Sequence, residues 1–350
     1  MEVDLAALTR NARAAQSRAG VPLIPMVKAD GYGLGAQPIA LALEPLEPSA
    51  YGVATISEGQ VLREAGISRP VIVFSPLLSD EYTAARELRL TPTLGSAKEI
   101  AAWCREGRGW HLSIDTGMSR AGVPWREVGS LREVVAWHKP DGAFTHFHSA
   151  ELDDGSMAEQ EHRFREAVAA LPDRPRLLHT DGSAAMVRHG KSEWDAIRPG
   201  IFLYGVGSGA GLSLDPEPVI HVRARIAETR WIEPGDSVSY DATWRAESRR
   251  RIGTISMGYA DGYPRALSNR SSVLARDGRV PVRGLVTMDM IMLDLTDSTC
   301  GIGDVVTLIG AGENGEHIGV AELADLAEMS PYELLTGLRG RLSRVYTEVE

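Results

Sequence analysis

The chain has 350 residues, of which 43% are hydrophobic and 24% are charged, and its formal net charge is -10. This length suits one large domain with a smaller one, and the acidic balance argues against nucleic acid or an anionic membrane surface as a partner. The two cysteines, Cys104 and Cys300, lie far apart, which predicts neither a disulfide framework nor a zinc site. Together with the absence of a signal-peptide pattern or a long apolar run, they lead us to expect a cytoplasmic protein.

Short strand and helix patterns alternate from the N-terminus to about residue 215. Apolar runs predict strands at 23–27, 51–55, 71–74, 90–94, 110–115, 142–147 and 176–179, with 197–204 closing the series. Helical spacing predicts a first helix after Asp4 and further helices at 36–46, 57–65, 79–88, 96–105, 125–138, 158–170 and 183–188. This succession predicts an eight-stranded α/β barrel of the TIM type.

The pattern changes near Asp215, where period-two alternation and Gly-Asp turns replace the strand–helix pairs. Strands are predicted at 220–226, 235–240, 251–256, 272–275, 290–295 and 304–309, and one helix at 318–327. We therefore expect a barrel domain over residues 1–215 and a mostly antiparallel β domain over residues 216–350.

Lys28 ends the first buried strand, and glycines follow it on both sides of Tyr32. Burial disfavours an ammonium ion and lowers the pKa of the amine, which makes it a usable nucleophile. A reactive amine followed by a glycine-flanked tyrosine is typical of a covalent cofactor site at a barrel strand end. A surface lysine before an ordinary glycine turn explains this stretch equally well.

Further polar residues follow other predicted strands, and they come from different parts of the barrel. Because strand ends of a parallel barrel meet at one face, we expect a shared site formed by Arg120, His146, Ser183, Arg198 and Gly200. Each arginine could instead be a solvated residue at a turn.

The histidines of this region allow one alternative reading. His146 and His148, with His179 and Asp181, could form the metal site of a barrel hydrolase. That reading leaves Lys28 without a role, and no metal is expected.

Taken together, several stretches resemble the alanine racemase family of enzymes that use pyridoxal 5′-phosphate (PLP), over essentially the whole chain. The matching stretches are 27–35, 115–122, 145–147, 198–205, 238–243, 258–264 and 288–289. Their number and order make the resemblance more specific than any single motif. It implies racemisation of alanine, a supply of D-alanine for peptidoglycan precursors, and a homodimer whose active sites take residues from both chains.

The resemblance also implies residue roles. Lys28 would hold PLP covalently and act as one base, and Tyr240 of the partner chain would act as the second. Cofactor binding would fall to Tyr32, His146, Ser183, Arg198, Gly200 and Ile201, with His146 on the ring and Arg198 at its nitrogen. Substrate binding would fall to Arg120, Met288 and Tyr259.

Two departures from the family pattern stand out. The family often has a lysine where this chain has Ser113, and a tyrosine at the position aligned with Gly340. We expect another group to orient Arg120, and a wider pocket with weaker discrimination against serine or larger amino acids. The alternatives are a serine-type or broad-specificity racemase, a related PLP decarboxylase, and a regulatory protein that carries PLP without turnover.

Overall fold

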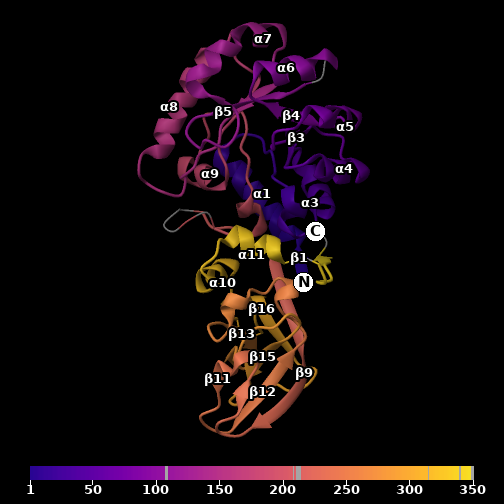
Figure 1. Ribbon diagram of the computed structural model, residues 1–350, viewed down its shortest axis with the longest axis vertical. Helices are drawn as coiled ribbons and strands as arrows, with labels where there is room; N and C mark the ends of the chain where they lie inside the picture. Colours follow the sequence, from indigo (N-terminus) through magenta and orange to yellow (C-terminus); the bar gives the residue numbers. More distant parts are fainter. Residues whose placement is uncertain (107–108, 208, 210–213, 314, 339, 348–350) are drawn as a thin grey trace.

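The computed structural model describes residues 1–106, 109–207, 209, 214–313, 315–338 and 340–347. The chain forms two parts arranged along its long axis, an α/β barrel and a β domain (Figure 1). Within the described residues, no helix is long and apolar enough to cross a membrane.

Six parallel strands form most of the barrel wall. They are β2 (Tyr51–Val53), β3 (Val71–Val73), β4 (Thr91–Leu94), β5 (His111–Asp115), β7 (Gly142–Phe144) and β8 (Leu177–His179). The short strand β6 (Val123–Pro124) pairs with β5 outside this ring.

Two extended segments close the ring. Leu23 bridges Ile197, and Met26 bridges Gly52 of β2, both in parallel orientation. On the other side, the Asp195 N–H donates to the Leu178 carbonyl of β8 at 2.9 Å. The predicted eight-stranded barrel is therefore confirmed, although segment 23–27 is buried backbone with isolated bridges where a regular strand was expected.

Helices cover the outside of the barrel. They are α1 (Leu5–Ala19), α3 (Ala36–Leu43), α4 (Ile56–Glu64), α5 (Tyr82–Glu87), α6 (Ala97–Trp103), α7 (Arg132–Trp137), α8 (Ser156–Ala169) and α9 (Ser183–His189). Shorter 3-10 turns are η1 (Glu44–Leu46), η2 (Ser79–Glu81), η3 (Cys104–Glu106), η4 (Trp125–Leu131) and η5 (Ile201–Tyr204). The Asp4 side chain caps α1 as predicted, because it accepts the Ala7 N–H.

The β domain is built around one long strand, β9 (Ile220–Ile232). It pairs antiparallel with β12 (Arg250–Ile255) and β16 (Val305–Ala311). The other strands are β10 (Ser237–Val238), β11 (Trp244–Arg245), β13 (Ser272–Ala275), β14 (Gly278–Pro281), β15 (Ile291–Asp294) and β17 (His317–Ile318). The 3-10 turns η6 (Tyr240–Ala242), η7 (Tyr259–Asp261) and η8 (Arg265–Leu267) connect them. The predicted antiparallel β domain is confirmed.

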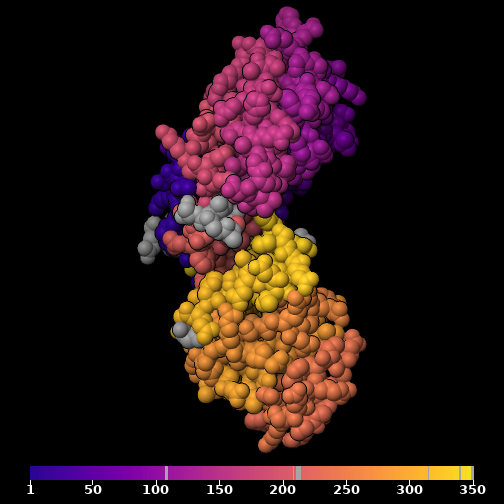
Figure 2. Space-filling view, turned by 90° about the vertical axis from the view of Figure 1, so that its left-hand side faces the viewer, coloured from indigo at the N-terminus to yellow at the C-terminus, as the bar shows by residue number. Residues whose placement is uncertain are grey.

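Both ends of the described chain lie in the sheet of the β domain. Strand β1 (Glu2–Asp4) pairs antiparallel with β9 and parallel with β18 (Val345–Thr347). The helices α10 (Val320–Ala327) and α11 (Pro331–Gly337) lie between the barrel and the rest of the β domain (Figures 1 and 2). The strands β1 and β18 and helix α11 were not predicted from the sequence.

Candidate active site

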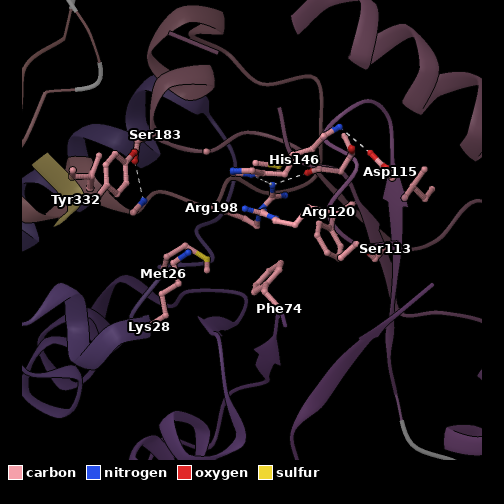
Figure 3. A pocket seen from close by; sticks show the side chains of 18 of the residues that line it. Met26, Lys28, Phe74, Ser113, Asp115, Arg120, His146, Ser183, Arg198 and Tyr332 are labelled. Carbon is pink, nitrogen blue, oxygen red and sulfur yellow. Dashed lines mark hydrogen bonds between the residues drawn. The ribbon is translucent and has the colours of Figure 1, made fainter. Parts of the chain in front are cut away.

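A cavity of about 320 Å³ opens where the barrel strands end (Figure 3). It is lined by all the site residues that the sequence predicted in the barrel: Lys28, Tyr32, Arg120, His146, Ser183, Arg198, Gly200 and Ile201. In the close view, Ser183 lies at one end and Asp115 at the other, with Arg198 and His146 between them. The structure therefore brings these residues together at one face of the barrel.

Lys28 enters the cavity from an unusual backbone. Residues 29–32, which follow it, all have positive φ between 52° and 61°, so the chain makes a left-handed turn. This conformation is costly for residues with a Cβ, and it persists where surrounding contacts hold it. Here the Glu58 carboxylate accepts the Ala29 N–H at 2.7 Å. Burial lowers the pKa of Lys28, and Arg120 lowers it further, which favours the unprotonated, nucleophilic amine.

The Ser183 end of the cavity has the donors of an anion site. The Ser183 hydroxyl accepts the backbone N–H groups of Gly200 at 2.9 Å and Phe202 at 3.3 Å. A Cβ on Gly200 would lie 2.3 Å from the Tyr32 hydroxyl, so a side chain would obstruct this end. Ile201 lines the same end. The Ser183 and Tyr32 hydroxyls converge on a space that stays open because residue 200 is a glycine. Hydroxyl donors around such a space suit the binding of a phosphate.

Arg198 is held deep in the site by uncharged acceptors. Its guanidinium donates to the carbonyl oxygens of Thr145 and Thr180 at 2.7 and 2.8 Å, to the His179 carbonyl, and to His179 Nδ1 at 2.8 Å. His179 Nε2 must then carry the proton, and it donates to His111 Nδ1 at 2.9 Å. Burial lowers the pKa of Arg198 to about 10, so it remains a cation at neutral pH.

Arg120 is positioned by the carboxylate of Asp115 at the end of β5. Asp115 Oδ1 accepts three successive backbone N–H groups, from Gly117 at 2.9 Å, Met118 at 2.9 Å and Ser119 at 3.1 Å. These bonds fold the loop that brings the exposed Arg120 side chain to the cavity. Asp115 is thus the residue that orients this part of the site.

His146 lies beside Arg198, with its Nδ1 3.4 Å from the guanidinium. Burial, then the charges of Arg198 and Arg120, lower the pKa of His146 well below its usual value, so the ring is neutral. His148 instead bonds to Ser149. Among the described residues, no group of three or more His, Cys, Asp or Glu side chains could hold a metal ion.

Three predicted site residues lie elsewhere, on the surface of the β domain. Tyr240, Tyr259 and Met288 are 70%, 43% and 52% exposed, and none of them lines the cavity. The Tyr259 N–H donates to the Thr287 carbonyl at 3.0 Å, which ties two of these loops together. Ser239 just before Tyr240 has a φ of 67°, a strained value for a residue with a side chain. We call Tyr240, Tyr259 and Met288 the C-terminal patch.

Tyr332 lines the cavity but was missed by the sequence reasoning. It lies in the first turn of α11, and its ring centroid is 6.2 Å from that of Tyr32 (Figure 3). A Cβ on Gly33 would lie 2.8 Å from the Leu335 carbonyl, so the glycine permits the close packing that delivers Tyr332. Gly340 lines a separate cavity together with Tyr259, so the widening expected at Gly340 stays a prediction.

The two halves of the chain match two family models. Residues 3–208 match "Alanine racemase, N-terminal domain", and residues 219–346 match "Alanine racemase, C-terminal domain". The alanine racemase of Citrifermentans bemidjiense is 38% identical, with 99% of this chain and 98% of the relative covered. That of Deinococcus radiodurans is 34% identical, with 98% and 97% covered.

The chain belongs to the alanine racemase family. The predicted resemblance is therefore confirmed, and with it the class of isomerase. Among solved structures, alanine racemase from E. faecalis superimposes with a TM-score of 0.93 at 29% identity, over 99% of this chain and 97% of that one. Alanine racemase from Bartonella henselae, described with covalently bound pyridoxal phosphate, gives 0.91 at 28% identity, over 99% and 98%.

The position where many alanine racemases carry a lysine is occupied by the buried Ser113 on β5. A Cβ on Gly122 would lie 2.6 Å from the Ser113 hydroxyl, so the two residues pack directly against each other. Ser113 also lines a second, smaller cavity of about 160 Å³ next to the main one. No orienting side chain replaces the lysine at this position, and Asp115 takes the structural role in the Arg120 loop.

Proposed function

We propose that this chain interconverts L- and D-alanine with PLP as its cofactor. The observation that carries the proposal is the single cavity that joins Lys28, Arg198, Arg120 and the Ser183 end. When bound there, PLP would withdraw electrons from the substrate, so that the proton on Cα becomes acidic. The Gly200 opening and the Ser183 and Tyr32 hydroxyls fit its phosphate, and Tyr332 closes the same end.

The barrel residues have distinct tasks in this scheme. Lys28 would hold the cofactor covalently, and because its lowered pKa favours the unprotonated amine it could take a proton from one face of Cα. Arg198 would bind the ring nitrogen, and because it keeps its own proton it would leave that nitrogen unprotonated. The neutral ring of His146 would pack on the cofactor, and Arg120 would bind the substrate carboxylate through its planar fork.

Racemisation needs a second base on the opposite face of Cα, and we assign this role to Tyr240 of a partner chain. The high exposure of the C-terminal patch and its separation from the cavity of its own chain support this assignment. In a symmetric dimer each patch would complete the partner's cavity, with Met288 and Tyr259 next to the substrate. Residues 1–215 would then form the PLP domain, and residues 216–350 would serve the partner's site.

Mixed dimers of two inactive variants test this arrangement. Lys28→Ala and Tyr240→Phe should each be nearly inactive alone. When the two are unfolded, mixed in equal amounts and refolded, random pairing gives hybrids with one intact site, so about a quarter of wild-type activity should return. Each variant refolded alone is the control. If both residues served the same chain's site, mixing would restore nothing.

The remaining parts of the proposal concern specificity and location. Alanine is the expected substrate, and serine is the alternative that the sequence left open; a panel of amino acids scored for exchange between D and L forms separates them. Retention of the substrate carboxylate distinguishes racemisation from decarboxylation. We also assign the enzyme to the cytoplasm, where D-alanine would enter peptidoglycan precursors.

A further inference from the structure

The buried Asp181 and the half-buried His189 form a pair behind the cavity, at the two ends of α9. Asp181 precedes the helix and has no exposed surface, and His189 is its last residue. His189 Nδ1 lies 3.4 Å from Asp181 Oδ1. The carboxylate also accepts the hydroxyls of Thr180 at 2.6 Å and Ser192 at 2.9 Å. Neither member of the pair lines the cavity, and the proposed reaction assigns neither a role.

The turn that this pair anchors carries two elements of the proposed cofactor site. The Thr180 carbonyl accepts the Arg198 guanidinium, and the Asp181 carbonyl accepts the Arg198 backbone N–H at 2.7 Å. Ser183 follows two residues later and holds the backbone of Gly200. A shift of this turn would therefore move the guanidinium and the anion end of the cavity together.

The charge of Asp181 has a second consequence for Arg198. The guanidinium is almost fully buried, and its described hydrogen-bond acceptors are carbonyl oxygens and imidazole nitrogens, which carry no formal charge. A buried cation without a counter-charge is strongly disfavoured. Burial lowers the pKa of Arg198, and the Asp181 charge opposes that change. Asp181 thus supplies the compensation that the direct ligands of Arg198 lack.

His189 is the group that modulates this carboxylate. The hydrogen bond with Asp181 raises the pKa of His189, and burial opposes it. Glu161 of α8 faces the ring from the other side, with Oε2 3.9 Å from Nε2, and Glu193 adds negative charge nearby. Arg165 binds both of these glutamates. Arg18 of α1 reaches the end of α9 at a backbone carbonyl.

We propose that Asp181 and His189 act as positioning residues for the cofactor site, by anchoring the turn between β8 and α9 and by supplying the counter-charge of Arg198. The inference rests on the proposed PLP chemistry and names two residues that work through Arg198 and Ser183. In this arrangement a protonated His189 shares the Asp181 charge with Arg198, and a neutral His189 leaves that charge to Arg198 alone.

Asp181→Asn tests the charge while keeping the size and most hydrogen-bonding capacity of the side chain. Ser192→Ala is the matched control, because it removes one partner of the carboxylate and leaves the charge. We expect Asp181→Asn to weaken PLP binding to the apoenzyme about tenfold, since coupling through such networks is typically worth that order, and Ser192→Ala to weaken it far less. Equal losses in both variants, or no loss in Asp181→Asn, would overturn the proposal.

A second variant covers the case in which Asp181→Asn does not fold. His189→Gln keeps a hydrogen-bond donor for Asp181 but cannot titrate. The PLP affinity of wild type divided by that of His189→Gln should change with pH over the range in which His189 titrates. Lys28 and PLP titrate in both proteins, so their effects on affinity cancel in this ratio. A ratio independent of pH would contradict the inference.

The interaction between Asp181 and His189 can be tested without any cofactor, through the pKa of His189. Nuclear magnetic resonance of the His189 ring in the apoenzyme should give a pKa above that of an ordinary histidine, and Asp181→Asn should lower it. An unchanged value in that variant would refute the pair. Failure of wild type to bind PLP or racemise alanine would instead refute the proposed function, so the two failures are distinguishable.

Discussion

The barrel cavity and the C-terminal patch differ in how complete they are within one chain. In the cavity, Arg198 is buried and donates hydrogen bonds to Thr145, His179 and Thr180, and Ser183 holds the backbone of Gly200. In the patch, Tyr240 is 70% exposed on a strained turn. Hydrogen bonds within the chain hold the cavity residues in place, whereas we propose that the patch packs against a partner chain. Cofactor binding and catalysis should therefore be separable.

The largest expected effect separates the two regions directly. Lys28→Ala should reduce racemase activity at least about 10³-fold, because it removes both the covalent link and one base. Tyr240→Phe should reduce activity about 10²- to 10⁴-fold while the covalent link to PLP remains. The measurements are alanine turnover and the absorbance of bound PLP after dialysis.

Two conservative changes serve as controls for this comparison. Lys191→Ala alters an exposed lysine, and Tyr82→Phe alters a buried tyrosine away from the cavity. Both should leave turnover and bound PLP near wild type. Loss of the covalent link in Tyr240→Phe would show that the two regions are not separable.

A smaller effect probes the anion end of the cavity alone. Gly200→Ala places a Cβ 2.3 Å from the Tyr32 hydroxyl, and overpacking of this kind costs about 1–3 kcal/mol. PLP affinity of the apoenzyme, followed by fluorescence titration, should fall by about one to two orders of magnitude. Gly129→Ala is the control, because its Cβ would meet nothing within 4 Å. Equal PLP affinities of Gly200→Ala and Gly129→Ala would show that a Cβ at position 200 does not obstruct this end of the cavity.

The smallest effect concerns stability in acid and the buried histidines of the barrel. Burial lowers the pKa of His111 to about 3 and that of His179 well below 6.5. Below about pH 6.5 the unfolded chain binds protons that the folded chain does not, so stability falls as pH falls. The slope is about 1.4 kcal/mol per pH unit for each histidine.

His111→Gln should reduce this slope by the contribution of one histidine, because glutamine does not titrate. The fold should be kept, because the amide oxygen can still accept the His179 N–H. Urea unfolding at neutral pH and at about pH 5 gives the slope for both proteins. A slope equal to that of wild type would mean that His111 is protonated in the folded barrel.

The residues of the cavity were predictable for a topological reason. Arg120, His146 and Ser183 follow the parallel strands β5, β7 and β8, and Lys28 and Arg198 follow the two extended segments that close the ring. In a barrel these ends meet at one face. The family resemblance then supplied their roles. The same reasoning could not reach Tyr332, because α11 belongs to the other part of the chain and no periodicity links it to the barrel mouth.

Other features escaped prediction for local reasons. Segment 23–27 reads as a strand from its apolar run, but it makes only isolated bridges to its neighbours. Strand β1 has three residues, too few for a pattern, and its partners lie in the β domain. The sequence also marks Tyr240 as functional without saying which chain's cavity it completes.

The pairing of β1 with β18 affects how the protein is made. The Met1 ammonium donates to the Ser343 carbonyl, 342 positions along the chain, so this contact cannot form during synthesis until residue 343 has left the ribosome. Helix α11, which brings Tyr332 to the cavity, also emerges close to the end. A nascent chain can assemble most of its barrel early and still lack this wall of its cofactor pocket, which is complete only after residues 331–337 have left the ribosome.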